Sequence, residues 1–136
     1  MISKKTKYGI KALVYVAKHK HKETVQVSLI ADTQNISPKY LEAIMLTLKK
    51  AGFLGSKKGK GGGYYLRRPP EDIKMVEVMR VLEGPVAMVP CVSLNFYEKC
   101  DDCPSEDFCS VNRLMIQLRD SSLAVLNKTT IADLVV

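Results

Sequence analysis

Apolar residues recur every three or four positions along five stretches of the chain, a spacing that is typical of amphipathic helices. The first stretch predicts a helix that begins after a cap at Ser3 and ends near Lys18. Two short helices are predicted within residues 28–50, one within residues 73–82, and a long one from residue 111. We therefore expect a mostly α-helical protein.

The two short helices carry the signals of a helix-turn-helix. Ser28 is a candidate cap for the first helix, and Asn35 tolerates the left-handed backbone of a turn. Ser37 and Pro38 suit the start of the second helix. Its predicted core face consists of Leu41, Ile44, Met45 and Leu48. The opposite face is polar and mostly basic, which suits the major groove of DNA, although a solvated helix face has the same pattern.

Residues 53–68 predict a β-hairpin directly after these helices. The strands are "FLGSK" and "YYLRR", and the glycines of residues 59–63 supply the turn. A nucleotide-binding loop would lead into a helix, whereas a strand follows here. We interpret the hairpin as a wing and expect one of Tyr64 and Tyr65 to face the core and the other to face solvent. Its basic residues are Lys57, Lys58, Lys60, Arg67 and Arg68.

Charge is divided unevenly along the 136 residues. The net charge is +7, and residues 1–68 hold 15 of the 21 Lys and Arg residues but three of the 14 acidic residues. A polyanionic partner is expected, with nucleic acid favoured over an anionic membrane. Apolar runs are too short to cross a bilayer and lysines interrupt the apolar N-terminus, so we expect a cytoplasmic protein without a membrane partner.

All four cysteines lie within nineteen residues, at Cys91, Cys100, Cys103 and Cys109. In a cytoplasmic protein, thiols gathered in this way bind metal, exchange redox states or pack inertly. A structural zinc site usually has two C-x2-4-C pairs, and only Cys100 and Cys103 have that spacing. An iron–sulfur cluster tolerates the irregular 8-2-5 spacing, so it is the favoured group.

Several segments together resemble one family of bacterial regulators. These are "ISPKYLEAIMLTLKKAGFLGSKKGKGGGYYL", "IKMVEVMRVLEG", the cysteine cluster and "TTIADLV". They are similar to the Rrf2 family of winged-helix transcription regulators, which includes IscR, NsrR and CymR. The resemblance implies a winged helix-turn-helix with a small β-hairpin, followed by a long C-terminal dimerisation helix. We expect a DNA-binding domain at residues 1–85, a cysteine-rich sensor loop at 86–110, and a dimerisation helix with a tail at 111–136.

The same resemblance implies a homodimer that binds double-stranded DNA at an imperfect palindrome in a promoter. No catalytic set of residues is found, so neither an enzyme nor a small-molecule substrate is expected. The apolar stripe of the last helix also favours pairing with a second copy, the alternative being that this helix folds back on its own domain. The candidate DNA-binding residues are Ser28, Ser37, Lys39, Tyr40, Glu42, Lys49, Lys57, Lys58, Lys60, Gly61, Gly62 and Tyr64.

Cluster-binding relatives use three cysteines, which match Cys91, Cys103 and Cys109 here. Their fourth ligand is a histidine three residues after the last cysteine, where this chain has Asn112, or an acidic residue of the first helix, where this chain has residues 4–7 of mostly lysine. We therefore expect Cys100 to complete an all-cysteine site for a two-iron two-sulfur cluster. The leading hypothesis is a regulator that senses iron–sulfur status, redox state or nitric oxide. The alternative is the same fold with zinc or free thiols and regulation by a protein partner.

Overall fold

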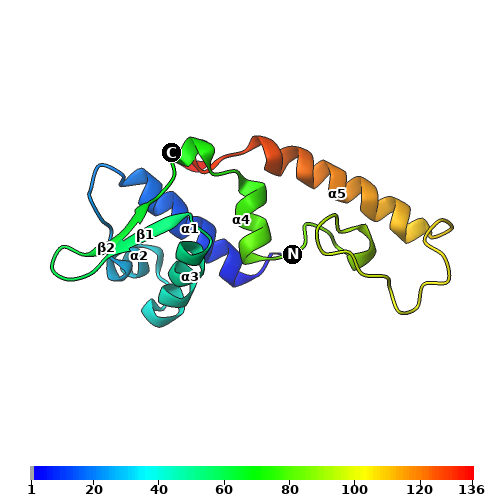
Figure 1. Ribbon diagram of the computed structural model, residues 1–136, viewed down its shortest axis with the longest axis horizontal. Helices are drawn as coiled ribbons and strands as arrows, with labels where there is room; N and C mark the ends of the chain where they lie inside the picture. The colour runs from blue at the N-terminus through cyan, green and yellow to red at the C-terminus, as the bar shows by residue number, and fades with distance from the viewer. Residues whose placement is uncertain (1) are drawn as a thin grey trace.

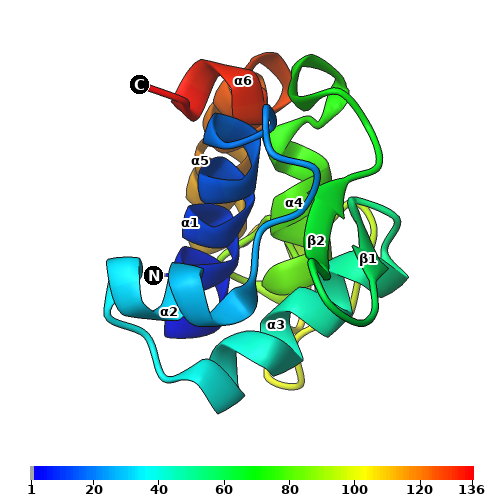
Figure 2. The ribbon, with the colours of Figure 1, turned by 90° about the vertical axis from the view of Figure 1, so that its left-hand side faces the viewer.

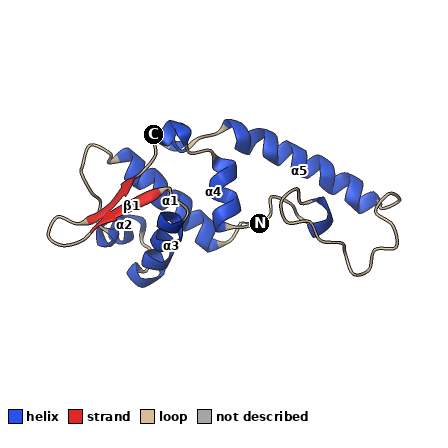
Figure 3. Cartoon of the chain, in the orientation of Figure 1, coloured by secondary structure: helices blue, strands red, loops and turns tan. Residues whose placement is uncertain are grey.

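The computed structural model describes residues 2–136, which form helices, one hairpin and two short 3-10 helices (Figures 1 and 3). In chain order these are α1 (Lys4–Lys18), α2 (Val27–Gln34), α3 (Pro38–Lys50), β1 (Leu54–Lys57), β2 (Gly63–Leu66), η1 (Pro70–Asp72), α4 (Met75–Leu82), η2 (Pro90–Val92), α5 (Ser110–Lys128) and α6 (Ile131–Leu134). The predicted combination of mostly α structure with a small hairpin is confirmed.

Local signals place the first three helices. The Ser3 hydroxyl caps α1 by accepting from the Thr6 backbone N–H, at 3.2 Å. Asn35 ends α2 with a φ of 55°, and Pro38 is the first residue of α3. The proposed cap at Ser28 is wrong, because α2 already begins at Val27 and Ser28 lies exposed in its first turn. An antiparallel bridge to Tyr64 holds Val25 extended, and Gln26 is the extended residue before the helix, which therefore begins at Val27, one residue before Ser28.

The core lies between α1, α3 and α4, and α6 completes it. The predicted core face of α3 is confirmed, since Leu41, Ile44, Met45 and Leu48 are all buried. Ile131 of α6 is also fully buried, and its backbone N–H donates to the Ile73 carbonyl at 2.9 Å. The segment after α5 therefore returns to the N-terminal part of the chain, where α6 packs against α1.

The wing is a two-stranded antiparallel ladder in which Leu54 pairs with Leu66. The expectation that one tyrosine faces solvent is wrong, because Tyr64 and Tyr65 are both half-buried. Tyr64 packs against the core, and the ring of Tyr65 covers Gly55, where a Cβ atom would lie 2.4 Å from the Tyr65 Cζ atom. The missing side chain of Gly55 thus makes room for a ring that would otherwise be exposed.

The wing and the cysteine segment, residues 86–110, lie at opposite ends of the long axis of the molecule (Figure 1). Figure 2 looks along this axis from the wing side and shows α3 and the hairpin side by side in front. Helix α5 runs back from the cysteine segment and packs against α4 and η2. Four of its large apolar side chains remain exposed: Val111, Leu114, Leu118 and Val125. No helix within residues 2–136 is long and apolar enough to cross a membrane.

Candidate DNA interface and cysteine site

The outward face of α3 carries the exposed candidate contacts Lys39, Tyr40, Glu42 and Lys49. The rings of Tyr40 and Tyr8 of α1 form a T-shaped pair, with 5.9 Å between the centroids and 84° between the ring planes. Lys49 donates from Nζ to the Ser56 hydroxyl at 2.7 Å and so joins the end of α3 to β1. Ser37 stands exposed at the start of the same helix. The tyrosine contact thus joins α3 to α1, and the Lys49 bond joins α3 to the wing.

The wing carries three exposed lysines with different surroundings. Lys57, at the end of β1, donates to the carboxylate of Glu23, which lies in the loop after α1. The hydrogen bond and charge of Lys57 lower the pKa of Glu23, and those of Glu23 raise the pKa of Lys57. Among residues 2–136, Lys58 and Lys60 at the wing tip have no carboxylate partner. The tip therefore presents positive charge that is free to meet phosphate.

Glycines bring the wing tip close to its own backbone and to the loop after α1. The Gly61 carbonyl accepts from the Thr24 hydroxyl at 2.7 Å. A Cβ atom on Gly62 would lie 2.5 Å from the Lys57 carbonyl oxygen. Tyr64 is half-buried at the base of the wing, where burial raises its pKa.

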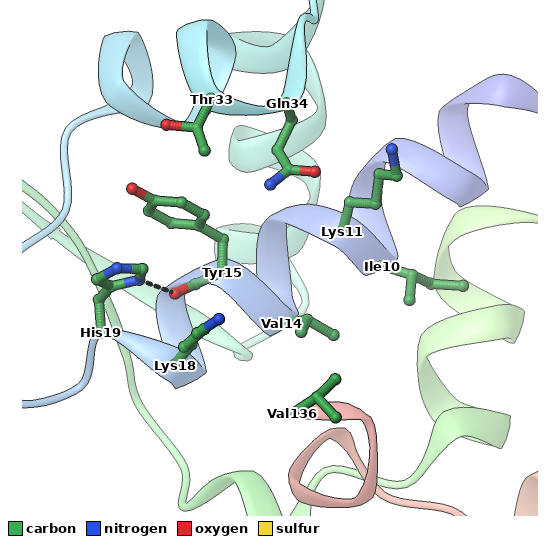
Figure 4. Close-up of a pocket in the computed structure, with 9 residues that line it drawn as sticks. All are labelled: Ile10, Lys11, Val14, Tyr15, Lys18, His19, Thr33, Gln34 and Val136. Carbon is green, nitrogen blue, oxygen red and sulfur yellow. Dashed lines mark hydrogen bonds between the residues drawn. The ribbon is translucent and has the colours of Figure 1, made fainter.

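A cavity of about 480 Å³ lies between α1, α2 and the end of the described chain (Figure 4). At its rim the His19 ring stacks on Tyr15, with the centroids 4.2 Å apart. The His19 Nδ1–H donates to the Tyr15 carbonyl at 2.9 Å and so ends α1. His21 lies nearby, with 6.0 Å between the two imidazole centroids. The position of His19 is explained by this capping role.

The four cysteines are half-buried free thiols that line one cavity of about 490 Å³ beside the start of α5. Cys109 caps α5, since its Sγ accepts from the Asn112 backbone N–H at 3.4 Å. The Asn112 side-chain Nδ2 donates to Cys91 Sγ at 3.3 Å. Interaction with the neighbouring Cys91 raises the pKa of the Cys100 thiol. The fold thus gathers the predicted ligands around one space.

Zinc and an iron–sulfur cluster place different demands on these cysteines. Among the described residues, no three His, Cys, Asp or Glu side chains converge closely enough to hold a single metal ion. A tetrahedral zinc ion needs four donors around one point, at about 2.3 Å for thiolate sulfur. A two-iron cluster divides its four thiolate ligands between two irons. The four cysteines that line this cavity are the donor type that both groups use.

Two contacts that the sequence did not indicate hold the cysteine segment together. The Tyr97 hydroxyl donates to the Glu106 carboxylate and so closes the stretch that contains Cys100 and Cys103. This hydrogen bond raises the pKa of Tyr97 to about 12. Arg119 of α5 donates from Nη1 to the Val92 carbonyl at 2.8 Å and thereby fixes η2 on the helix. Both contacts join residues that no local motif connects.

Known proteins match this chain over nearly its whole length. Residues 2–136 match the family model Rrf2, described as iron-dependent transcriptional regulator. An Rrf2-like HTH-type transcriptional regulator of Rhodobacter capsulatus is 36% identical over 98% of this chain and 91% of its own length. The structure of CymR, the global cysteine regulator of B. subtilis, has a TM-score of 0.80 at 34% identity and covers 98% of this chain and 95% of its own. IscR of T. potens has a TM-score of 0.77 at 33% identity, over 98% and 85%.

Proposed function

The chain belongs to the Rrf2 family of DNA-binding transcriptional regulators, and we propose that its affinity for a promoter site is controlled by an iron–sulfur cluster bound to Cys91, Cys100, Cys103 and Cys109. The predictions of the family, of a winged-helix regulator and of a chain that is not an enzyme are confirmed. We propose that the protein acts in the cytoplasm. The single observation that carries the sensing proposal is the cavity lined by all four cysteines.

We propose that the outward face of α3 and the wing tip contact the DNA. Lys39 and Lys49 of α3, with Lys58 and Lys60 of the wing, would neutralise phosphates and fix the orientation on the duplex. Glu42 is exposed on the same face as Lys39 and can accept from a cytosine amino group. The Tyr8–Tyr40 contact supports a fixed approach of α3 to the groove.

We propose that the protein binds DNA as a homodimer. The exposed apolar residues of α5, among them Leu114 and Leu118, form a face that a second copy of the helix would bury. An imperfect palindrome requires two such units at a set spacing. Since residues 86–110 connect α4 to α5, their arrangement can favour one spacing of the two units over another. The coupling free energy for such an effect is typically about 1 to 3 kcal/mol.

A bound cluster would supply a group that oxidant, nitric oxide or iron shortage alters. The protein's part is to hold the cysteines at one end of α5, to cover them partly from solvent, and to donate hydrogen bonds to sulfur through Asn112. The iron-dependent description of the family model supports iron as the metal.

The proposal is tested on protein purified without oxygen, by a visible absorption spectrum with iron, sulfide and zinc analysis. We expect a brown protein with absorbance between about 300 and 600 nm and equal amounts of iron and sulfide, as thiolate-bound clusters have. Colourless protein that contains zinc, or that takes up no cluster on reconstitution, would contradict the sensing proposal and leave the DNA-binding function intact.

The DNA interface is tested separately, in a titration against a promoter fragment at several salt concentrations. Lys39→Ala and Lys60→Ala are each expected to lower affinity and to reduce the salt slope by about one phosphate contact. Lys128→Ala, at the end of α5, is the matched control. Equal affinities of all three variants and the parent would exclude this interface.

A second candidate function is a thiol switch without metal. Cys91 and Cys100 are free thiols that line the same cavity, so these two could form a disulfide when a peroxide accepts their two electrons and two protons. Mass spectrometry of peroxide-treated, metal-free protein distinguishes the two candidates. A Cys91–Cys100 disulfide that changes DNA affinity as strongly as cluster loss would favour the switch.

A further inference from the structure

We propose that Asn112 is a positioning residue of the cysteine site, which holds the sulfurs of Cys91 and Cys109 with its two N–H groups and is not itself a ligand. The inference rests on the proposed function and deepens it. It assigns a role to the one position where the resemblance led us to look for a ligand and where this chain has an amide instead.

Asn112 is placed to reach both sulfurs at once. It lies in the first turn of α5, three residues after the helix cap Cys109, where its backbone N–H has no helical partner and donates to Cys109 Sγ at 3.4 Å. Its side chain turns toward η2 and donates from Nδ2 to Cys91 Sγ at 3.3 Å. Only 8% of the residue is exposed, so water competes little for these two bonds.

The orientation of the amide argues for a donor and against a ligand. A carboxamide nitrogen has its lone pair delocalised into the C=O bond and carries two hydrogens, so it donates to sulfur and does not bind iron. When Cys91 is a metal-bound thiolate, the alternative rotamer would bring the Oδ1 atom against electron-rich sulfur, which is repulsive. The same sulfur that accepts from Asn112 is therefore left with its remaining lone pairs for iron.

A second bond makes the arrangement rigid. Arg119 lies two turns further along α5 and donates to the carbonyl of Val92, the residue after Cys91. The 3-10 turn η2 is thus tied to the same helix at two successive residues, one through its sulfur and one through its backbone. Cys91 and Cys109, which are 18 positions apart in the sequence, are thereby held as a pair on α5, whereas Cys100 and Cys103 belong to the segment closed by Tyr97 and Glu106.

Hydrogen bonds to cysteine sulfur change the properties of a cluster in a known direction. They withdraw charge from the thiolate, which makes reduction easier, and outer contacts of this kind typically change metal retention by about 10- to 100-fold. Asn112→Leu keeps the size of the side chain and removes the Nδ2 donor. We expect it to bind the same iron and sulfide as the parent, with a more negative reduction potential and cluster loss in air about tenfold faster.

The experiment compares the parent, Asn112→Leu, Asn112→Gln and the control Asn127→Leu after anaerobic reconstitution. Asn127 is an exposed residue of the same helix, so its substitution makes the same chemical change away from the site. Iron content, reduction potential and visible circular dichroism are measured for each. Partial recovery of the parent potential in Asn112→Gln, with no shift in Asn127→Leu, is expected for a donor.

Two results would overturn the inference. One is loss of half or more of the iron in Asn112→Leu while Cys100→Ser keeps it, which would make Asn112 the ligand in place of Cys100. The other is an unchanged potential in Asn112→Leu, which would mean that no bond to sulfur is made.

A measurement without metal separates this inference from the proposed function. In nitrogen–proton correlation spectra of cluster-free protein, Cys91→Ala is expected to shift the side-chain amide signals of Asn112, and Cys103→Ala is expected to leave them in place. Equal spectra of both variants and the parent would disprove the contact. If the parent accepts no cluster, the sensing proposal fails, and this spectrum alone decides whether Asn112 holds Cys91.

Discussion

The carboxylate of Glu83 accepts a hydrogen bond from the hydroxyl of Thr6, a fully buried residue in the first turn of α1. The same carboxylate accepts from the Ser3 hydroxyl at 2.8 Å and from the Ser3 backbone N–H at 3.1 Å. Glu83 directly follows α4 and precedes the cysteine segment. One acidic side chain therefore joins the start of α1 to the end of α4, just before residues 86–110.

Replacement of this carboxylate should destabilise the fold. Glu83→Gln removes the charge that strengthens these bonds, and hydrogen bonds to charged groups are worth about 1.5 to 3 kcal/mol. The hydrogen bond from Thr6, with those from Ser3, lowers the pKa of Glu83 below 4.5. Its contribution is thus complete above about pH 4.5 and is lost as the pH falls through the lower, folded-state value.

Urea unfolding at pH 7 and at pH 3 measures this effect. We expect the difference between the parent and Glu83→Gln to be largest at pH 7 and to shrink at pH 3. Glu71→Gln, an exposed residue of η1, is the control. A difference that does not change with pH would rule out the charged form of Glu83 as its source.

Glu23 should restrain DNA binding through Lys57. Glu23→Gln removes the carboxylate that pairs with this lysine, so Lys57 becomes available to phosphate. We expect higher affinity for DNA of any sequence and a salt slope that is steeper by about one contact. Fluorescence anisotropy over a range of salt concentrations measures both. Asp32→Asn changes net charge equally, and an identical effect there would point to overall charge instead of Lys57.

Gly63 should be needed for the wing to dock on the loop after α1. Its φ is 149°, and a Cβ atom would lie 2.6 Å from the Val25 carbonyl oxygen. Gly63→Ala therefore forces apart the two 2.8 Å bonds between Val25 and Tyr64. We expect a loss of about 1 to 3 kcal/mol in urea unfolding, together with weaker DNA binding. Unchanged stability would mean that the wing adapts without cost.

The apolar face of α5 should be the dimer contact. Leu118 is 40% exposed, and Leu114, one turn before it, is 52% exposed. Leu118→Glu places a charge in the expected contact and should convert the dimer to a monomer at micromolar concentration, as measured by sedimentation equilibrium. Gln117→Glu adds the same charge beside that face and should remain dimeric. A parent that is itself monomeric would refute the dimer proposal.

The Tyr97–Glu106 bond should protect the segment that contains Cys100. The pKa of Tyr97 is raised to about 12, so Tyr97 keeps its proton and this hydrogen bond until the pH rises well above 10. Tyr97→Phe removes the donor, so Lys99 should be cut by trypsin several times faster at pH 8. Tyr15→Phe on α1 serves as the control. Equal cleavage rates would show that other contacts close the segment.

Sequence alone determined the features that depend on neighbours along the chain. The core face of α3 follows from a 3.6-residue period, its start from Ser37 and Pro38, and the turn before it from the left-handed tolerance of Asn35. The candidate cysteines were also evident, because their spacing is local. Each of these properties is set within a few residues.

Tertiary structure decided the features that depend on residues far apart. Helix α2 begins directly after the extended segment that the Val25–Tyr64 bridge fixes, and Tyr65 is half-buried because Gly55 leaves space beneath its ring. The contacts of Asn112 with Cys91 and of Glu83 with Thr6 join positions 21 and 77 residues apart. No period or motif encodes such pairs, because they arise only when packing brings two remote segments to within hydrogen-bonding distance.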